Sequence, residues 1–497
     1  MHERGKSDGP VVPAKPPNNA AAAAAEAVEG RGLPKGNAAS ETRPGRRAGQ
    51  GVSSDLDRVR QVARKDRDAR FTALLHHVTV DRLREAYRAL RPDAAPGVDE
   101  LTWRDYGQDL ERNLRDLHAR VHRGAYRARP SRRAYIPKPD GRLRPLGVAA
   151  LEDKVLQRAL VEVLNAIYEC DFLGFSYGFR PGRSPHHALD ALAVGVLRRR
   201  VNWVLDADIR DFFTTLDHSW LERFLEHRIA DKRVLRLIAK WLRAGIIEDG
   251  AWSQTEAGTA QGASVSPLLS NVYLHYVFDL WADQWRRRHA RGDVIVVRFA
   301  DDYVAGFQHR DDAERFLRDL RERFARFVLE LHPEKTRLIE FGRFAAERRA
   351  GRGLRKPETF EFLGFTHICA KDRHGRFKLK RVTSKKRMRA KLSSVKAELM
   401  RRRHLPIPDQ GRWLASVLRG HCNYYAVPDN SKALRGFRHR VVRHWLRALR
   451  RRSQRTRRLH WKRMGRLAER WLPQPRILHP WPTVRFDATT QGRSPVR

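Results

Sequence analysis

Cysteine is scarce in this sequence, and long apolar runs are absent from it. The 497 residues include three cysteines, Cys170, Cys369 and Cys422, which lie far apart and form no CxxC pair. We therefore expect neither a disulfide framework nor a zinc module, and a reducing compartment. No run of 18 apolar residues occurs, and the first ten residues have no apolar stretch typical of a signal peptide. Membrane spanning and secretion are therefore not expected.

Acidic residues are also in short supply. The chain has 57 Asp and Glu against 101 Lys and Arg, a net charge of +44. Such a charge repels itself in a compact fold unless a polyanion binds it, which favours a nucleic-acid partner over a small-molecule enzyme with a neutral surface. A GC-rich coding sequence would explain the preference for Arg over Lys, but not the near doubling of basic over acidic residues.

Composition divides the chain into parts with different expected structures. Residues 1–50 are rich in Pro, Gly and Ala, which predicts a disordered basic tail. Residues 51–134 show helical periodicity, and helices then alternate with short apolar strands over 135–375, which predicts a mixed α+β core. Residues 376–486 are assigned to a basic domain whose pattern becomes almost wholly helical after Ser384. Residues 381–470 contain 28 Lys and Arg against 4 Asp and Glu. Residues 487–497 are expected to form a short C-terminal tail.

The most informative segment for chemistry is VIVVRFADDYVAGF, residues 294–307. Two apolar arms flank Asp301 and Asp302, which predicts a hairpin with adjacent carboxylates at its turn. Such acids are often only solvated turn residues. Here they follow a strand that must be buried, and two neighbouring carboxylates repel one another unless a cation lies between them. A hard divalent metal ion is the expected occupant.

A second strand with acidic residues is predicted upstream, in VNWVLDADIRDFF, residues 201–213. Strand alternation places Asp206 and Asp208 on the face opposite Leu205 and Ala207. If this strand pairs beside the hairpin, Asp208 joins Asp301 and Asp302 in one cluster. Three carboxylates that hold two Mg²⁺ ions are a known solution for nucleotidyl transfer, so the pattern favours a polymerase.

Further motifs follow one another in a fixed order. They are IPKPDGRLRPLGV (136–148), GFRPGRS (178–184), DADIRDFFTTLDH (206–218), GTAQGASVSPLLSNVYL (258–274), FADD (299–302), LHPEKT (331–336), FEFLGF (360–365) and GHCNYYAV (420–427). In this order and spacing the chain resembles bacterial group II intron-encoded reverse transcriptases and maturases, collinearly from about residue 72 to about residue 486. Phe299, Ala260 and Ala263 depart from the usual motifs, which more often have Tyr, Pro and Gly.

The resemblance implies a right-hand polymerase. Residues 51–134 would extend the fingers, 135–375 would form fingers and palm, and 376–486 would form an all-helical basic thumb or maturase (X) domain. Asp208, Asp301 and Asp302 would be the catalytic acids and ligands of two Mg²⁺ ions, with the backbone carbonyl of Ile209 as a further ligand.

The resemblance also implies a nucleotide site. Lys138, Arg142 and Arg144 flank a PDG turn that would fold over the triphosphate of a dNTP, although a plain surface hairpin could carry the same residues. Phe213 would lie under the sugar and exclude a 2′-hydroxyl, with an ordinary core residue as the alternative.

Two further residues are expected at the nucleotide. Gln261 would support the template or the incoming base. Lys335 would protonate the leaving pyrophosphate, unless it is only a surface lysine.

The basic C-terminal part is the expected RNA-binding surface. Arg443, Arg447 and Arg450 are spaced to share one helix face. Tyr424 and Tyr425 are among the aromatic residues that interleave with the basic runs, and basic residues with aromatic residues between them are typical of nucleic-acid surfaces. We therefore predict that these five residues bind RNA.

The resulting functional hypothesis is an RNA-directed DNA polymerase that also binds its group II intron RNA and assists splicing and mobility. Its partners would be intron RNA, an RNA template, a DNA primer or target, and dNTPs, in the cytoplasm with nucleoid or ribonucleoprotein association. No Cys follows Cys422, so no His/Cys-rich nuclease is expected. The alternatives are a maturase with an idle polymerase, and a related reverse transcriptase in defence or repair. A basic structural protein would have no reason to hold three carboxylates at strand ends.

Overall fold

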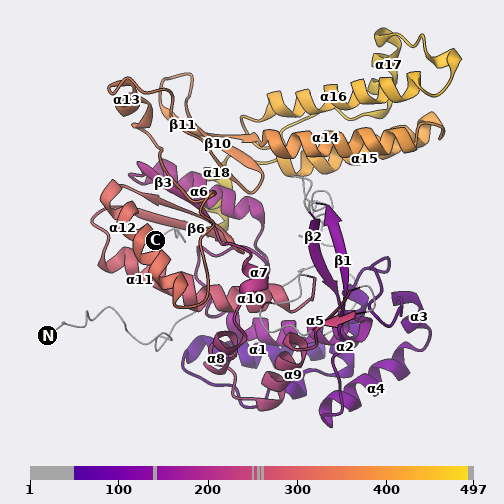
Figure 1. Cartoon of the computed structure of the whole chain (residues 1–497), viewed down its shortest axis with the longest axis vertical. Coiled ribbons are helices and arrows are strands. Elements are labelled where there is room, and N and C mark those ends of the chain that lie inside the picture. The colour runs from indigo at the N-terminus through magenta and orange to yellow at the C-terminus, as the bar shows by residue number, and fades with distance from the viewer. Residues whose placement is uncertain (1–49, 138–142, 249–250, 254–257, 259–261, 491–497) are drawn as a thin grey trace.

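The computed structural model describes residues 50–490 except 138–142, 249–250, 254–257 and 259–261. Its helices and strands form a mixed α and β structure, as predicted. Figure 1 shows a helical base built from the N-terminal half, a central sheet beside it, and a separate group of long helices formed by the C-terminal part. The predicted tail over 1–50 lies outside the described residues, apart from Gln50.

The base begins with amphipathic helices whose ends are set by side-chain caps. Thr79 caps α2 through Arg82 N, and Thr102 forms a reciprocal capping box with Asp105 at the start of α3. The helices of this region are α1 (Gln50–Lys65), η2 (Leu75–His77), α2 (Val80–Ala89), α3 (Trp103–Gln108) and α4 (Leu110–His122). They pack against α5 (Leu151–Tyr168), most of whose residues are buried.

A four-stranded sheet in the order β2-β1-β4-β5 follows. Its strands are β1 (Ser131–Pro137), β2 (Leu143–Val148), β4 (Ile246–Glu248) and β5 (Ala251–Ser253). Since β1 starts at Ser131, the predicted helical extension ends a few residues before the expected boundary at 134. Helices α8 (His218–Glu226) and α9 (Lys232–Leu242) complete the base.

The central sheet has the order β6-β7-β3-β8 and is antiparallel throughout. Its strands are β3 (Trp203–Asp208), β6 (Val294–Phe299), β7 (Asp302–Phe307) and β8 (Arg337–Glu340). One face packs against α12 (Arg310–Ala325) and the other against α6 (Pro185–Arg198). Both faces are apolar over most of their length, because residues of both parities along each strand are buried.

Shorter elements connect the base with the central sheet. They are α7 (Phe212–Thr215), α10 (Ser266–Leu274), the π-helix η3 (His275–Asp279) and α11 (Leu280–Arg288). Helix α13 (Ala345–Ala350) instead lies on the side of the sheet away from the base (Figure 1). Helix α10 and η3 are buried. Helix α10 contacts both α5 and α8, and Tyr276 of η3 stacks on Phe224 of α8. They therefore join the base to the layer beneath the sheet.

A third sheet separates the central sheet from the C-terminal helices. It is formed by β9 (Phe360–Phe362), β10 (Phe365–Lys371) and β11 (Phe377–Thr383). Strand β11 lies inside the region 376–486 that was assigned to the helical thumb, whereas the helices begin at Lys385, as the pattern after Ser384 predicts. Strand β11 pairs with β10 along its whole length, and Arg381 on it donates a hydrogen bond to Asp190 of α6 at 2.9 Å.

The C-terminal helical domain comprises α14 (Lys385–Arg401), α15 (Ile407–Tyr425), α16 (Ser431–Arg450), η4 (Gln454–Thr456) and α17 (Trp461–Trp471). It has its own core, in which Trp445 is fully buried and donates from Nε1 to Gln410 Oε1 at 2.9 Å. This core makes the domain a separately packed unit.

The first residues of the predicted C-terminal tail are helical. Helix α18 (Pro482–Thr490) returns to α6, where Arg485 bonds to Asp190 and Arg198 pairs with Asp487 at 2.6 Å. Residues 487–490 therefore belong to the folded structure. Residues 491–497 lie outside the described part.

Truncation of Trp445 should destabilise the C-terminal helical domain. We expect Trp445→Ala to lower its free energy of unfolding by roughly 3–5 kcal/mol, because a fully buried indole is lost and Gln410 Oε1 loses its donor. Chemical denaturation followed by circular dichroism measures this. Trp461, which is 45% exposed on α17, is the matched control, and its replacement by Ala should cost less than about 1 kcal/mol. Equal losses would show that burial is not the source.

Candidate functional site

The two predicted acidic segments lie side by side in the central sheet. Strand β3 pairs with β7 so that Asp208 is directly opposite Asp302, and Asp301 stands in the two-residue turn between β6 and β7. This confirms the predicted hairpin and its pairing with the 201–213 strand. Acidic residues from two distant segments of the sequence therefore lie at the same end of the sheet.

Charge is concentrated on one face of that sheet end. Asp206, Asp208 and Asp302 share the strand parity of Val204 and Val304, which face α6. Burial raises the pKa of the Asp302 carboxyl well above its usual range, and the nearby Asp301, Asp206 and Asp208 raise it further. The arrangement disfavours negative charge on Asp302 unless a cation compensates for it.

Two cationic side chains already reach this face. Lys335 Nζ bonds to Asp208 Oδ2, and Arg337 Nη2 donates to Asp206 Oδ2 at 3.0 Å. Within the described part of the chain, no three Asp, Glu, His or Cys side chains are arranged around a common point as a metal site requires. The donor chemistry nevertheless suits a hard cation, because the carboxylates are adjacent and Asp208 already binds an ammonium group.

The turn that carries Asp301 is supported from beneath by Arg298, which the sequence reasoning missed. The side chains of Arg298 and Asp279 are both fully buried, and Arg298 donates from Nε to Asp279 Oδ1 at 2.7 Å. It also donates to Asn271 Oδ1 at 3.0 Å and to the carbonyl of Ala300 at 2.8 Å. An arginine inside an otherwise apolar strand, in VIVVRF, was the available signal.

Phe213 lies in α7, half-buried against the main core, with its ring 5.4 Å from that of Phe212. Gly258 lies against it: a Cβ at Gly258 would stand 2.6 Å from the Phe213 carbonyl oxygen, and its φ is 85°. Glycine is therefore required there to let two backbone segments approach.

Only one of the other residues predicted at the nucleotide lies in the described part of the chain. Arg144 lies on β2, opposite Ile136 on β1. Lys138, Arg142 and Gln261 lie outside the described residues, as does Ala260.

The predicted RNA-binding residues divide into two groups. Arg443, Arg447 and Arg450 are exposed on one face of α16, as expected, and Arg450 also donates to the Leu459 carbonyl at 2.9 Å. Tyr424 and Tyr425 instead pack around Phe365, and the Tyr424 hydroxyl donates to the Leu363 carbonyl at 2.8 Å. Their packing disagrees with the prediction that they bind RNA, because a ring used to join two domains does not offer its face to a base.

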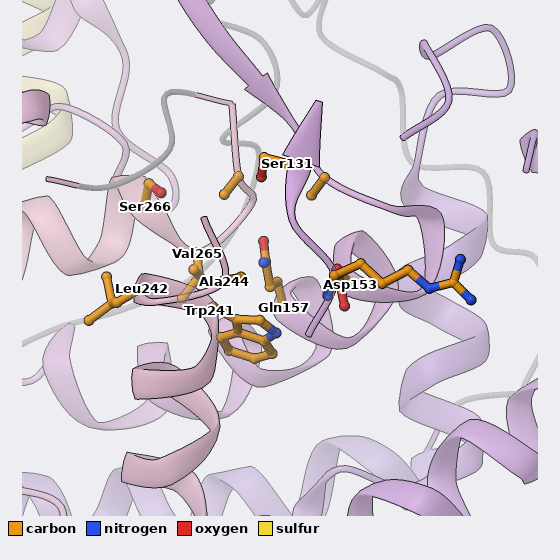
Figure 2. Close-up of a pocket in the computed structure, with 11 residues that line it drawn as sticks. Ser131, Asp153, Gln157, Trp241, Leu242, Ala244, Val265 and Ser266 are labelled. Atoms are coloured by element: carbon orange, nitrogen blue, oxygen red, sulfur yellow. The ribbon is translucent and has the colours of Figure 1, made fainter. Parts of the chain in front are cut away.

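A small pocket lies away from the carboxylates (Figure 2). Asp153, Gln157 and Trp241 gather beneath the start of β1, with Ser266 of α10 at the opposite side. Burial raises the pKa of Asp153 to about 6, although the Tyr126 hydroxyl and the Arg129 N–H donate to its carboxylate. Its lining residues come from the base and α10, so the pocket is a junction between these elements and is separate from the acidic cluster.

Comparison with known proteins identifies the central part of the chain. Residues 136–367 match the family described as reverse transcriptase (RNA-dependent DNA polymerase). This range includes the three clustered acids, Lys335 and Arg298. No helix in the described part is both long and apolar enough to cross a membrane.

Three relatives illustrate the similarity. The chain is 35% identical to protein YkfC of Escherichia coli over 42% of its own length and 62% of the relative's. It is 32% identical to the group II intron-encoded protein LtrA of Lactococcus lactis over 44% of its length and 37% of that protein's. It is 28% identical to nuclear intron maturase 1 of Arabidopsis thaliana over 18% of its length and 13% of the relative's.

The chain thus covers less than two thirds of each of these relatives. Residues 136–367 therefore match a reverse transcriptase domain, and part of the chain is similar to a group II intron-encoded protein and to an intron maturase.

Proposed function

We propose that this protein is an RNA-directed DNA polymerase that also binds a group II intron RNA and assists its splicing and mobility. The observation that carries the proposal is the pairing of Asp208 with Asp302 beside the Asp301 turn, inside a reverse transcriptase domain. The central sheet would be the palm, the β2-β1-β4-β5 sheet and the base the fingers, and α14–α17 the thumb.

Asp208, Asp301 and Asp302 would hold two Mg²⁺ ions, with the Ile209 carbonyl as a further ligand. When bound, these ions lower the pKa of the primer 3′-hydroxyl and stabilise charge on the leaving pyrophosphate. The raised pKa of Asp302 supports this assignment, because neighbouring carboxylates need cations to remain ionised together. Lys335 would leave Asp208 as metal binds, which frees its ammonium group to approach the phosphates and protonate pyrophosphate.

The nucleotide would be held between the palm and the β1–β2 hairpin. Arg144 on β2, with Lys138 and Arg142, would neutralise the triphosphate, and Gln261 would support the template or base. The half-buried position of Phe213 supports a role beneath the sugar, since its ring is anchored on one side by the core. The proposed substrates are therefore dNTPs, an RNA template and a DNA primer.

Intron RNA would bind mainly along α16. Arg443 and Arg447 are exposed there, whereas the apolar face of the same helix is buried in the domain core. Contacts between guanidinium groups and phosphates provide affinity that falls with salt. A maturase with an idle polymerase is the rival function. Parallel assays of primer extension and splicing separate it from the proposed function.

Loss of Asp301 should separate polymerisation from RNA binding. We expect Asp301→Ala to lower cDNA synthesis on an RNA template at least ~10³-fold, because one of the three carboxylates that would hold the ions is removed. Binding and excision of the intron RNA should persist, since α16 lies on a different domain from the turn. Primer extension and splicing are measured in parallel on the same preparation.

The parallel assays decide between the two functions. If the wild-type protein promotes splicing but extends no primer, the idle-polymerase alternative holds. If Asp301→Ala retains full primer extension, Asp301 is not a catalytic acid. Loss of both activities in a folded variant contradicts the assignment of separate sites.

Phe213 should discriminate against ribonucleotides. We expect Phe213→Ala to raise the ratio of rNTP to dNTP incorporation by about 10–100-fold, because space opens beneath the sugar for a 2′-hydroxyl. Steady-state incorporation of a single nucleotide measures the ratio. The buried neighbour Phe212 provides the control, since Phe212→Leu should lower stability without changing the ratio. An unaltered ratio in Phe213→Ala would make Phe213 an ordinary core residue.

Charge reversal on α16 should weaken RNA binding. We expect the double variant Arg443→Glu, Arg447→Glu to reduce affinity for intron RNA on the order of 10²-fold at low salt, and to flatten its salt dependence. Arg450 is left intact because it holds the Leu459 carbonyl. Filter binding over a range of salt concentrations measures both quantities.

The control makes the same change of charge elsewhere. Arg112 and Arg115 are exposed on α4, in the base and far from α16 in Figure 1. If Arg112→Glu, Arg115→Glu weakens RNA binding equally, net charge and not the α16 surface determines affinity.

A further inference from the structure

The turn between β6 and β7 depends on a residue in an unfavourable conformation. Ala300 has a φ of 56°, in the left-handed region that residues with a Cβ rarely adopt. Such a conformation persists only where surrounding contacts enforce it, and it is common at functional sites. The contacts that enforce it here come from three other parts of the chain.

Arg298 fixes the orientation of the peptide group that follows Ala300. Its Nη1 donates to the Ala300 carbonyl oxygen at 2.8 Å. The peptide group that joins Ala300 to Asp301 is planar, so fixing the carbonyl also fixes the direction in which the Asp301 N–H and Cα leave the turn. The position of one proposed metal ligand is therefore linked to a guanidinium group two residues before the turn.

The guanidinium group is itself held rigidly. All five of its N–H groups have acceptors: besides Ala300, these are both oxygens of Asp279, Asn271 Oδ1 at 3.0 Å and Ser176 Oγ at 2.8 Å. Asp279 belongs to η3 and Asn271 to α10, so helices outside the sheet determine where the group lies. Because the buried guanidinium group has all its hydrogen bonds made, it is held in one position. Its bond to the Ala300 carbonyl then holds the turn in one conformation.

Gly178 supports the turn from another side. A Cβ at this position would stand 2.1 Å from the Ala300 backbone nitrogen, so no side chain fits there. Its carbonyl accepts from Asn271 Nδ2 at 2.7 Å, and Tyr177 N donates to the Arg298 carbonyl at 2.8 Å. Asn271 thus contacts both the guanidinium group and the segment that packs against the turn.

We propose that Arg298, with Asn271 and Gly178, is a positioning device that holds the Ala300–Asp301 peptide so that Asp301 and Asp302 can bind metal together with Asp208. The inference rests on the proposed function only in taking these carboxylates as the metal ligands. Arg298 touches neither substrate nor metal in this scheme. It acts through the backbone, which distinguishes it from a buried ion pair that contributes to stability alone.

The test measures metal binding without catalysis. The full-length protein is titrated with Mn²⁺ alone, and free Mn²⁺ is followed by electron paramagnetic resonance. We expect Arg298→Lys, which keeps the charge but loses the fork, to weaken Mn²⁺ binding on the order of tenfold. Gly178→Ala should also weaken Mn²⁺ binding, because its added methyl group pushes the turn away without removing any charge.

The matched control is Arg228→Lys. Arg228 is another buried arginine, paired with Asp171 at 3.2 Å in the base, and its side chain is 1% exposed. The Arg228→Lys variant also loses a buried guanidinium group, but one that does not contact the turn, so its Mn²⁺ affinity should stay at the wild-type value. Thermal unfolding of every variant identifies those that fold. If Arg298→Lys does not fold, the Mn²⁺ affinity of Gly178→Ala alone decides the test.

Three outcomes overturn the proposal. They are wild-type Mn²⁺ affinity in folded Arg298→Lys and Gly178→Ala, an equal loss of affinity in Arg228→Lys, and an absence of Mn²⁺ binding in the wild-type protein. Primer extension by the wild-type protein is run alongside. If Mn²⁺ binding follows the expected pattern but no primer is extended, the positioning role stands and the proposed polymerase function fails.

Discussion

Mutual repulsion among carboxylates at one end of the central sheet is the constraint around which this structure is organised. Asp206, Asp208 and Asp302 share a face, and the raised pKa of Asp302 reflects how strongly burial and its neighbours disfavour ionisation there. Basic side chains near the carboxylates offset this repulsion, some of them exposed and one of them buried. Lys335 and Arg337 reach the acids from the surface, where they can move. The buried Arg298 is neutralised by Asp279 and acts on the turn through its hydrogen bond to the Ala300 carbonyl.

The C-terminal helices are connected to this site through packed residues. Tyr424 and Tyr425 join α15 to β10, and Arg387 near the start of α14 lies close enough to Asp302 to lower its pKa slightly against the other effects. Helix α18 adds a second connection, since Asp190 accepts from both Arg381 and Arg485. The two tyrosine rings expected to bind RNA therefore attach the C-terminal helical domain to the third sheet. The exposed arginines of that domain remain accessible to phosphate groups.

Local pattern in the sequence was sufficient for the parts of the site that depend on strand periodicity. The alternation around Asp206 and Asp208 and the apolar arms around Asp301 predicted both strands and the turn, because one buried face fixes the register of a strand. Domain boundaries were less accessible. Strand β11 carries basic residues at many positions and reads as part of the basic region, and only its pairing with β10 makes it a strand. The final residues of α18 are helical because they pack on α6, which their composition does not reveal.

What the sequence could not show is which polar residues meet in the interior. Arg298, Asn271 and Asp279 come from different motifs, and nothing in their spacing distinguishes a buried network from a row of surface contacts. The roles of glycine are equally hidden: Gly178 and Gly258 each exclude a side chain because of a backbone segment more than 40 residues away in sequence. The proposed catalytic acids are recognisable because the chemistry proposed for them requires particular residue types. The residues that position them are defined by three-dimensional contact, so they become visible only once the fold brings the motifs together.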